Sequence, residues 1–328
     1  MLRRREFLYV IGATLSLPLA ANAQQKVRRI GVLLPFDDEH DPQVIQLWPA
    51  FTQRMQELGW SEGRNVHYDL RFATQDVDRI RKAAVDLVTS APDIIYVWAN
   101  PALAALKQAT RTIPIVFAQV SDPVGSGYVA NLARPGENIS GFQNFETAIG
   151  GKWLELLKEI APTVRRVGVV YNKNIPANVA FLHTAEAASA STGTTVTAIE
   201  LHEAAAIESS LTAFAQEPDA GLIVTPNPLN TTNRELIPAL AAKLRLPAIH
   251  PFHLFAFSGG LVSYGFDTIE QQRGAAGYVD RVLKGEKPSD LPVQAPTKYQ
   301  LVINLKTAKA LGLTISTQLQ QRADELIE

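Results

Sequence analysis

The sequence predicts an α/β protein made of two Rossmann-like lobes, each with a parallel β-sheet. From residue 28 onward, short apolar segments rich in Val and Ile alternate with longer amphipathic segments, which is the pattern of βαβ units. The apolar segments are continuous, as expected for strands of a sheet that is covered on both faces. The same order of elements then occurs a second time in the C-terminal half.

The strands predicted most clearly are four continuous apolar runs at 30–34, 94–98, 167–171 and 222–225. Between them, apolar residues recur at the spacing of an amphipathic helix. The predicted helices cover 44–58, 77–89, 102–110, 151–160, 177–191, 203–216 and 233–244. A chain of 328 residues is also long enough for its core to split in two.

Three pairs of segments show the repetition. RRIGVLLP at Arg28 is echoed by RRVGVVYN at Arg165, and PDIIYVWANP at Pro92 by PDAGLIVTPNP at Pro218. RTIPIVFAQVSDP at Arg111 is echoed by LRLPAIHPFHLF at Leu244. A gene duplication and a shared architecture explain this order equally well, and either implies two similar lobes.

The chain is expected to cross between the lobes three times, near residues 138–145, 261–266 and 291–296. A helix at 268–283 would return to the first lobe. The first lobe would then comprise residues 27–143 and 267–290, and the second lobe 144–262 and 297–328. Three such crossings make a hinge.

Residues 1–23 have the features of an export signal that is cleaved near Ala23. A basic start precedes an apolar run from Phe7 to Ala20 and then Ala21-Asn22-Ala23. RREFL within it resembles the twin-arginine pattern for export of folded proteins, with ordinary secretion as the alternative. A membrane anchor is disfavoured because the apolar run is shorter than the roughly 20 residues that span a bilayer. We therefore expect a periplasmic protein.

Composition narrows the class of protein further. The formal net charge is −1, so nothing favours nucleic acid as a partner. The chain has no cysteine, which rules out disulfides and thiolate metal ligands and leaves an apolar core to stabilise an exported, monomeric protein.

Ligands of open α/β sheets bind beyond the carboxyl ends of the strands, where helix N-termini converge. Polar and aromatic residues follow the predicted strands at those places. The candidate ligand-binding residues are Phe36, Asn100, Pro101, Gln119, Ser121, Asp122, Asn172, Asn227, His250, Phe252, Tyr264 and Asp267. Each polar residue taken alone is also explained as a helix cap or turn former, so their joint placement around one cleft carries the hypothesis.

Two ligand groups can be matched to these residues. A ligand ammonium group would need a desolvated carboxylate, for which Asp122 and Asp267 are the candidates. A ligand carboxylate could be held by backbone N–H groups at Asn100 or Asn227, with help from Ser121. Aromatic residues at the strand ends could stack on a flat ligand.

Signals for an enzyme are weak, and we predict no catalytic residue, cofactor or metal site. Gly125-Ser126-Gly127 fits a loose dinucleotide-binding pattern but follows an Asp-Pro turn inside a lobe. His250 and His253 have no obvious third metal ligand. The sequence contains no P-loop and no HExxH motif.

Several segments resemble the ABC-transporter substrate-binding family typified by the receptors of tryptophan and tyrosine importers. They are QELGWSEGRNV, TIPIVFAQVSDPV, LARPGENISGF, GGLVSYG and, most specifically, LKGEKPSDLPVQAPTKYQLVINLKTAKALGL. The resemblance covers essentially the whole chain. It implies a type I periplasmic-binding (Venus-flytrap) fold, with a small-molecule ligand in the cleft and delivery to an ABC permease and its ATPase.

Carried over residue by residue, the resemblance implies ligand loops at Asn100 and Pro101, 119–122, Asn227, 250–252 and 264–267. One loop departs from the family pattern, because the segment that is small and rich in Gly and Thr in many relatives has Trp98-Ala99-Asn100-Pro101 here. The implied ligand is an aromatic or other amino acid, or an aromatic acid. The alternatives are a periplasmic sensor subunit with the same ligands and, less favoured, an enzyme on a Rossmann-like scaffold.

Overall fold

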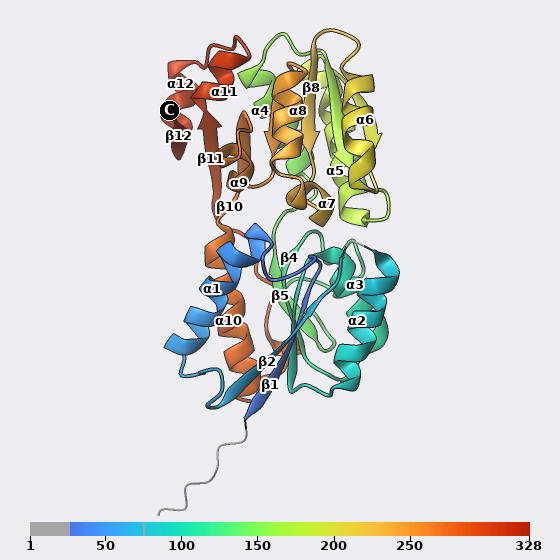
Figure 1. Ribbon diagram of the computed structural model, residues 1–328, viewed down its shortest axis with the longest axis vertical. Helices are drawn as coiled ribbons and strands as arrows, with labels where there is room; N and C mark the ends of the chain where they lie inside the picture. The colour runs from blue at the N-terminus through green and yellow to red at the C-terminus, as the bar shows by residue number, and fades with distance from the viewer. Residues whose placement is uncertain (1–26, 75) are drawn as a thin grey trace, which may run out of the picture.

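The computed structural model describes residues 27–74 and 76–328, so the predicted export signal lies outside the described residues. Two α/β lobes lie end to end along the long axis of the molecule (Figure 1). Each lobe has its own β-sheet, and the strand orders are β2-β1-β3-β4-β5 and β12-β11-β10-β9-β8-β6-β7. Two α/β lobes with mostly parallel sheets confirm the predicted fold class.

The first lobe consists of the sheet β1–β5 and the four helices packed on it. All of its strand pairs are parallel. The strands are β1 Arg28–Leu34, β2 Val66–Phe72, β3 Ile94–Trp98, β4 Ile115–Val120 and β5 Ile139–Gln143. The helices are α1 Pro42–Glu57, α2 Val77–Thr89, α3 Asn100–Ala109 and α10 Thr268–Leu283. Helices α1 and α10 lie side by side and share one core with the sheet, whereas α2 and α3 cover the opposite face (Figure 1).

The second lobe consists of the sheet β6–β12 and its helices. The strands are β6 Arg166–Tyr171, β7 Thr195–Glu200, β8 Ala220–Val224, β9 Ala248–His250, β10 Val262–Phe266, β11 Tyr299–Asn304 and β12 Glu325–Ile327. The helices are α4 Ile149–Ile160, α5 Pro176–Thr192, α6 Ile207–Phe214, α7 Pro228–Thr232, α8 Leu236–Lys243, α9 His253–Phe257, α11 Leu305–Ala310 and α12 Thr317–Arg322. Short 3₁₀ turns lie at Ala204–Ala206 and Pro288–Asp290.

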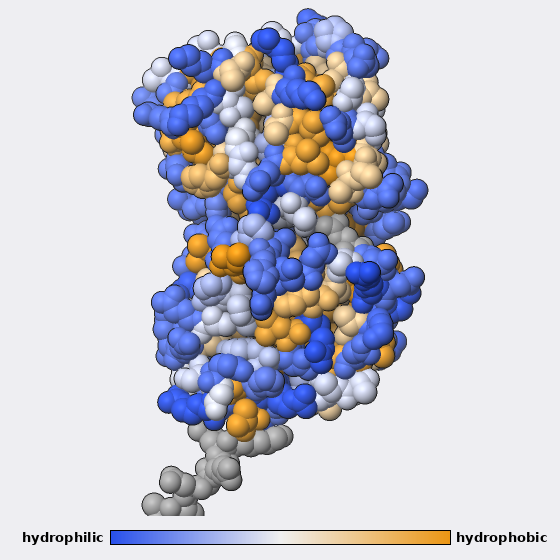
Figure 2. Space-filling model, in the orientation of Figure 1, coloured by the Kyte–Doolittle hydropathy of each residue, from blue (hydrophilic) through white to orange (hydrophobic). Residues whose placement is uncertain are grey.

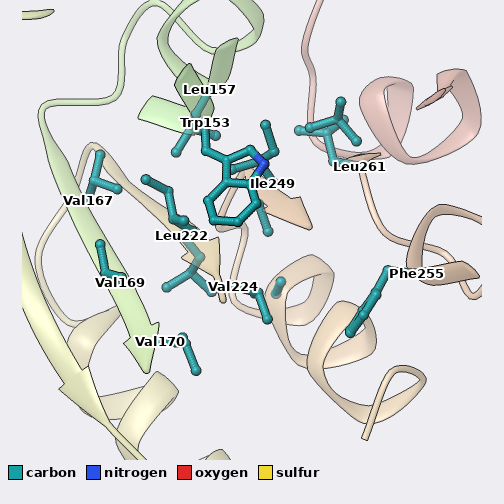
Figure 3. Close-up of a cluster of buried hydrophobic side chains, with 14 of the residues drawn as sticks. Trp153, Leu157, Val167, Val169, Val170, Leu222, Val224, Ile249, Phe255 and Leu261 are labelled. Carbon is teal, nitrogen blue, oxygen red and sulfur yellow. The ribbon is translucent and has the colours of Figure 1, made fainter. Parts of the chain in front are cut away.

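Side chains from both faces of the second sheet form the largest apolar core. Trp153 and Leu157 of α4 pack on strand residues such as Leu222 and Ile249, and Phe255 of α9 closes another side (Figure 3). Polar residues cover much of both lobes on the face shown in Figure 2, with smaller apolar areas between them. Among residues 27–74 and 76–328, no helix is both long enough and apolar enough to cross a membrane.

The chain passes between the lobes at three places. It leaves β5 for α4 through residues 144–148, and it leaves β10 for α10 at Asp267. The third passage follows residues 292–296, where the backbone N–H of Gln294 donates to Gly141 at 2.9 Å and extends the edge of the first sheet. Helix α10 therefore belongs to the first lobe in space, where Trp60 Nε1 donates to Asp280 at 2.8 Å.

Several elements differ from the sequence prediction. Strand β11 runs antiparallel to β10, which interrupts the parallel pattern. Strands β2 and β7 were not among the predicted buried strands because they lie at sheet edges and each contains one buried residue, Val66 and Ile199 respectively. The predicted helix at 233–244 begins at Leu236, and a separate short helix, α7, precedes it because Asn227 caps that turn.

Gly150 allows α4 and α5 to approach closely. A Cβ atom at Gly150 would lie 2.2 Å from the carbonyl oxygen of Phe181, whereas one at Gly151 would lie 3.4 Å from the Cβ of Ala188. We expect Gly150→Ala to lower the free energy of unfolding by about 2 kcal/mol or more, because the two helices must separate. Gly151→Ala is the matched control and should be neutral or stabilising by up to about 1 kcal/mol. Urea denaturation of both variants checks this, and equal stabilities would contradict it.

Candidate functional site

A cleft between the two lobes contains a cavity of about 530 Å³, which we call the outer cavity. Its walls on the first lobe include Pro35, Asn100, Pro101, Ala104, Gln108 and Tyr128. Its walls on the second lobe include Asn172, Asn174, Ile175, His202, Asn227 and Pro228. The cavity therefore lies at the carboxyl ends of strands from both sheets, where the sequence placed the ligand.

A smaller space of about 20 Å³, which we call the inner chamber, adjoins the outer cavity. Asn100, Pro101, Ile175, Asn227 and Pro228 line both spaces. Further walls of the chamber come from Phe36, Gln43, Trp98, Gln119, Thr231 and Phe252. Its volume suits one or two water molecules or a single small polar group.

Two of the residues that line both spaces, Asn100 and Pro101, lie at the start of α3, just after β3. Ala99 precedes α3 with φ 67°, a left-handed conformation that is costly for a residue with a side chain. Asn100 holds this loop against the end of β4, because its Nδ2 donates to Ser121 O at 2.8 Å and its Oδ1 accepts from Ser121 N at 2.9 Å. No side chain caps α3, and Pro101 has no N–H, so the first N–H groups of the helix are those of Asn100 and Ala102.

Gln119 lies at the end of β4 in a second strained conformation, with φ 55°. Its backbone N–H donates to Gln271 Oε1 of α10 at 2.9 Å, and its Oε1 accepts from Gln43 Nε2 at 3.0 Å. Its Nε2 is buried without a hydrogen-bond partner. A strained residue with an unused buried donor is typical of a binding site.

Asn178 organises the wall contributed by the second lobe. This fully buried side chain accepts from Thr225 Oγ1 at 2.9 Å, Asn227 Nδ2 at 3.0 Å and the backbone N–H of Asn172 at 3.2 Å. Its Nδ2 donates to the carbonyl oxygen of Pro226 at 3.0 Å. One side chain on α5 thus fixes the loops that follow β6 and β8.

The aromatic residues of the chamber belong to two clusters. Phe36 meets Trp98 edge to face, with ring centroids 6.2 Å apart, and Phe252 packs against Phe145 at 5.7 Å. In the outer cavity, Tyr128 is nearly buried, and its hydroxyl donates to Asn100 O at 3.2 Å. Burial raises the pKa of Tyr128, so its phenol is neutral at physiological pH and keeps this donated hydrogen bond.

Few charged side chains line the outer cavity and the inner chamber. Among the described residues that line either space there is no Asp or Glu. The Arg81 guanidinium at the outer cavity is paired with Asp78 at 2.6 Å, and the His202 ring hydrogen-bonds to Glu200. Asp41 lies beside the chamber at the start of α1, where burial raises the pKa of its carboxyl against the opposing effect of Arg234 from the second lobe.

Seven predicted residues line the cleft: Phe36, Asn100, Pro101, Gln119, Asn172, Asn227 and Phe252. Ser121 lines neither space, but its Oγ donates at 2.7 Å to Oδ1 of Asn144, which lines the inner chamber. Asp122 turns away to accept from the backbone N–H of Gly125 at 2.9 Å.

The other three predicted residues lie outside both spaces of the cleft. His250 is fully buried and stacks on Phe255 with centroids 4.9 Å apart. Tyr264 stacks on Tyr299 at 5.5 Å. Asp267 caps α10 and lines a separate cavity of about 470 Å³ beside the hinge. Neither aspartate proposed for a ligand ammonium group therefore lines the cleft.

Sequence reasoning missed Gln43, Tyr128, Asn144, Ile175, Asn178 and Thr231. Asn178 left a signal, because it is a polar residue on the face of α5 that buries Phe181 and Ala185. Gln43 also left one, since Asp41-Pro42 is a helix start and the residue after it lies at the end of the helix near the cleft. Within residues 27–74 and 76–328, no group of three His, Cys, Asp or Glu residues could hold a metal ion.

Comparison with known proteins gives one family match that spans most of the chain. The model of the family described as "ABC transporter substrate binding protein" matches residues 39–327. A tyrosine-binding protein from Clostridioides difficile is 27% identical over 278 residues, covering 84% of this chain and 79% of the relative.

Solved structures agree with this match. A conserved domain protein from Vibrio cholerae O1 biovar eltor is 28% identical and superposes with a TM-score of 0.85, over 92% of this chain and 100% of its own. An ABC domain in complex with L-Trp from Streptococcus pneumonia has the same TM-score and coverage at 24% identity, a likeness that concerns the fold.

Proposed function

Because the chain belongs to the family of ABC transporter substrate-binding proteins, we propose that it is the periplasmic solute-binding component of an ABC importer. Proteins of this family bind solutes and are not enzymes. The proposed partners are an ABC permease and its ATPase, to which the protein would deliver its ligand as a monomer. Residues 1–23 would direct export and then be removed.

The observation that carries the proposal is the cleft itself. A cavity of about 530 Å³ is walled by both lobes, and the chain connects these lobes at three crossings. This volume is in the range of small-molecule sites. Ligand that bridges the two walls would stabilise the closed arrangement of the lobes, since it gains contacts that the open arrangement lacks.

The proposed ligand is a small organic molecule, either an aromatic or other amino acid or an aromatic acid. The relatives named for tyrosine and L-Trp support an amino-acid or aromatic ligand. Prolines, Tyr128 and Ile175 supply the apolar surface of the outer cavity, and the side chains of Asn100, Asn172 and Asn227 supply polar contacts. Apolar walls with a few fixed polar groups are typical of such sites.

A thermal-shift screen of L-tyrosine, L-tryptophan, L-phenylalanine and the matching aromatic acids tests this function. A ligand that binds only the folded protein adds about 2.7 kcal/mol of stability at a hundredfold excess over Kd. We expect Ala104→Trp to abolish the shift, because the indole would fill the outer cavity from α3. Ala187→Trp, at an exposed position of α5, is the matched control and should retain it. The proposal fails if no compound shifts the parent protein.

A further inference from the structure

At the inner chamber, the side-chain oxygens of Gln119, Asn100 and Asn144 already accept hydrogen bonds, whereas the donor Gln119 Nε2 is unused. Gln119 Oε1 accepts from Gln43, and Asn100 Oδ1 accepts from Ser121. Asn144 Oδ1 accepts from both Ser121 Oγ and Phe145 N, at 2.7 and 2.9 Å. Gln119 Nε2, on a side chain that is only 8% exposed, donates to nothing. A ligand group placed there would have to accept hydrogen bonds.

Asn227, on the opposite wall, has no free acceptor to change this balance. Its Oδ1 accepts from the backbone N–H of Asn230 at 2.8 Å, and its backbone carbonyl oxygen accepts from Thr231 Oγ1 at 2.9 Å. Its Nδ2 is held by Asn178. The amide and hydroxyl groups of the second lobe are therefore largely used to hold their own loop.

Two helix N-termini from different lobes strengthen the preference for an anion. Helix α3 and helix α5 both begin without a side-chain cap, and their first residues line the spaces of the cleft. Each helix start carries the equivalent of about half a positive charge. No carboxylate among the described lining residues offsets them.

The half-buried carboxylate at the start of α1, beside the chamber, is already engaged. Asp41 accepts from the backbone N–H of Gln43 at 2.8 Å and interacts with the charge of Arg234 across the cleft. It is thus a poor partner for an additional ammonium group, which needs an unengaged, desolvated carboxylate.

We propose that the cleft selects a monocarboxylate with an aromatic body and no α-ammonium group. The inference rests on the proposed solute-binding function and narrows its ligand class. The carboxylate would enter the inner chamber, where Gln119 Nε2 and the start of α3 donate to it. The aromatic body would occupy the outer cavity between Tyr128 and the prolines. An α-ammonium group at this junction would lose its hydration without gaining an anionic partner.

Matched ligand pairs test the proposal by isothermal titration calorimetry on the protein lacking residues 1–23. The pairs are 3-phenylpropionate with L-phenylalanine and 3-(4-hydroxyphenyl)propionate with L-tyrosine, which differ only in the α-ammonium group. Tyramine, which has the amine and no carboxylate, completes the set. We expect each acid to bind at least about tenfold more tightly than its amino acid, and tyramine to give no binding.

The outcomes separate this inference from the function on which it rests. If the amino acids bind as tightly as the acids or more tightly, the inference is overturned and the solute-binding function stands. If none of the compounds binds, both the inference and the proposed aromatic ligand are overturned.

Three variants locate the carboxylate. Gln119→Glu should weaken binding of the acids at least about a hundredfold, because it places like charges together in a buried site. Gln53→Glu adds the same charge at an exposed position of α1 that lines neither space of the cleft, and it should change Kd less than about threefold. Asp41→Asn should leave acid binding intact. Loss of amino-acid binding in Asp41→Asn would show that the parent protein recognises an ammonium group and would overturn the inference.

Discussion

Asn178→Ala is expected to lower the free energy of unfolding by about 3–5 kcal/mol and to weaken ligand binding at the same time. The substitution removes the acceptor for Thr225, Asn227 and the backbone of Asn172, together with the donor to Pro226. Each buried polar group left without a partner costs about 1–3 kcal/mol. Because Asn172 and Asn227 both line the outer cavity, their loops should shift and ligand affinity should fall by at least about tenfold.

Urea denaturation and calorimetry with the best ligand of the parent protein measure the two effects. Asn174→Ala is the matched control for stability, because Asn174 is exposed, lies in the same loop and donates to Asn172 through its backbone. Its stability should stay within about 0.5 kcal/mol of the parent. A parent-like denaturation midpoint for Asn178→Ala would show that the loops do not depend on this side chain.

The alternation of elements was predictable because each element carries a local signal. The bounds of α2 and α10 agree with the sequence prediction since an aspartate caps each start: Asp76 accepts from two backbone N–H groups, and so does Asp267. The bounds of β3 also agree with the predicted strand at 94–98, because its five buried residues are followed within two positions by the polar Asn100. Such signals lie within a few residues and need no tertiary contact.

The direction of β11 could not be predicted in the same way. Its partner β10 lies far away in sequence, and the continuous apolar pattern of a buried strand is the same in both directions. The crossing from β10 to α10 was expected, by contrast, because a helix at 268–283 was predicted to return to the first lobe.

The candidate site was predictable to the level of loops rather than side chains. Asp122 and Asp267 follow strands, as a ligand-binding carboxylate would, but the same position suits a residue that caps its own turn or helix. The structure shows the second role for both side chains. Gln43 and Asn178 approach the cleft from helices, where the only sequence signal is a polar residue just after a helix start or on a buried helix face.

His250 is expected to make the second lobe sensitive to acid. The ring is fully buried, stacks on Phe255, and has no hydrogen-bond partner on either nitrogen. Burial lowers its pKa from 6.5 to about 3. A lowered pKa means that the folded state disfavours the proton, so the stability contributed by neutral His250 is present above pH 6.5 and is lost as the pH falls towards 3.

Between pH 8 and pH 4.5, the free energy of unfolding should fall by about 2.7 kcal/mol because of His250. The unfolded state binds the proton below pH 6.5 and the folded state does not, and each of these roughly two pH units contributes about 1.4 kcal/mol. His250→Phe keeps the stacked ring and removes the titration, so its unfolding free energy should fall less over this range than that of the parent. His183→Gln, at an exposed position of α5, should retain the acid loss of the parent. Protonation of carboxylates with lowered pKa values, such as Glu200 and Asp324, also destabilises the protein in acid, but this effect is equal in all three proteins. The difference in slope between His250→Phe and the parent therefore isolates the buried imidazole, and parallel slopes would show that its protonation does not limit the acid stability of the lobe.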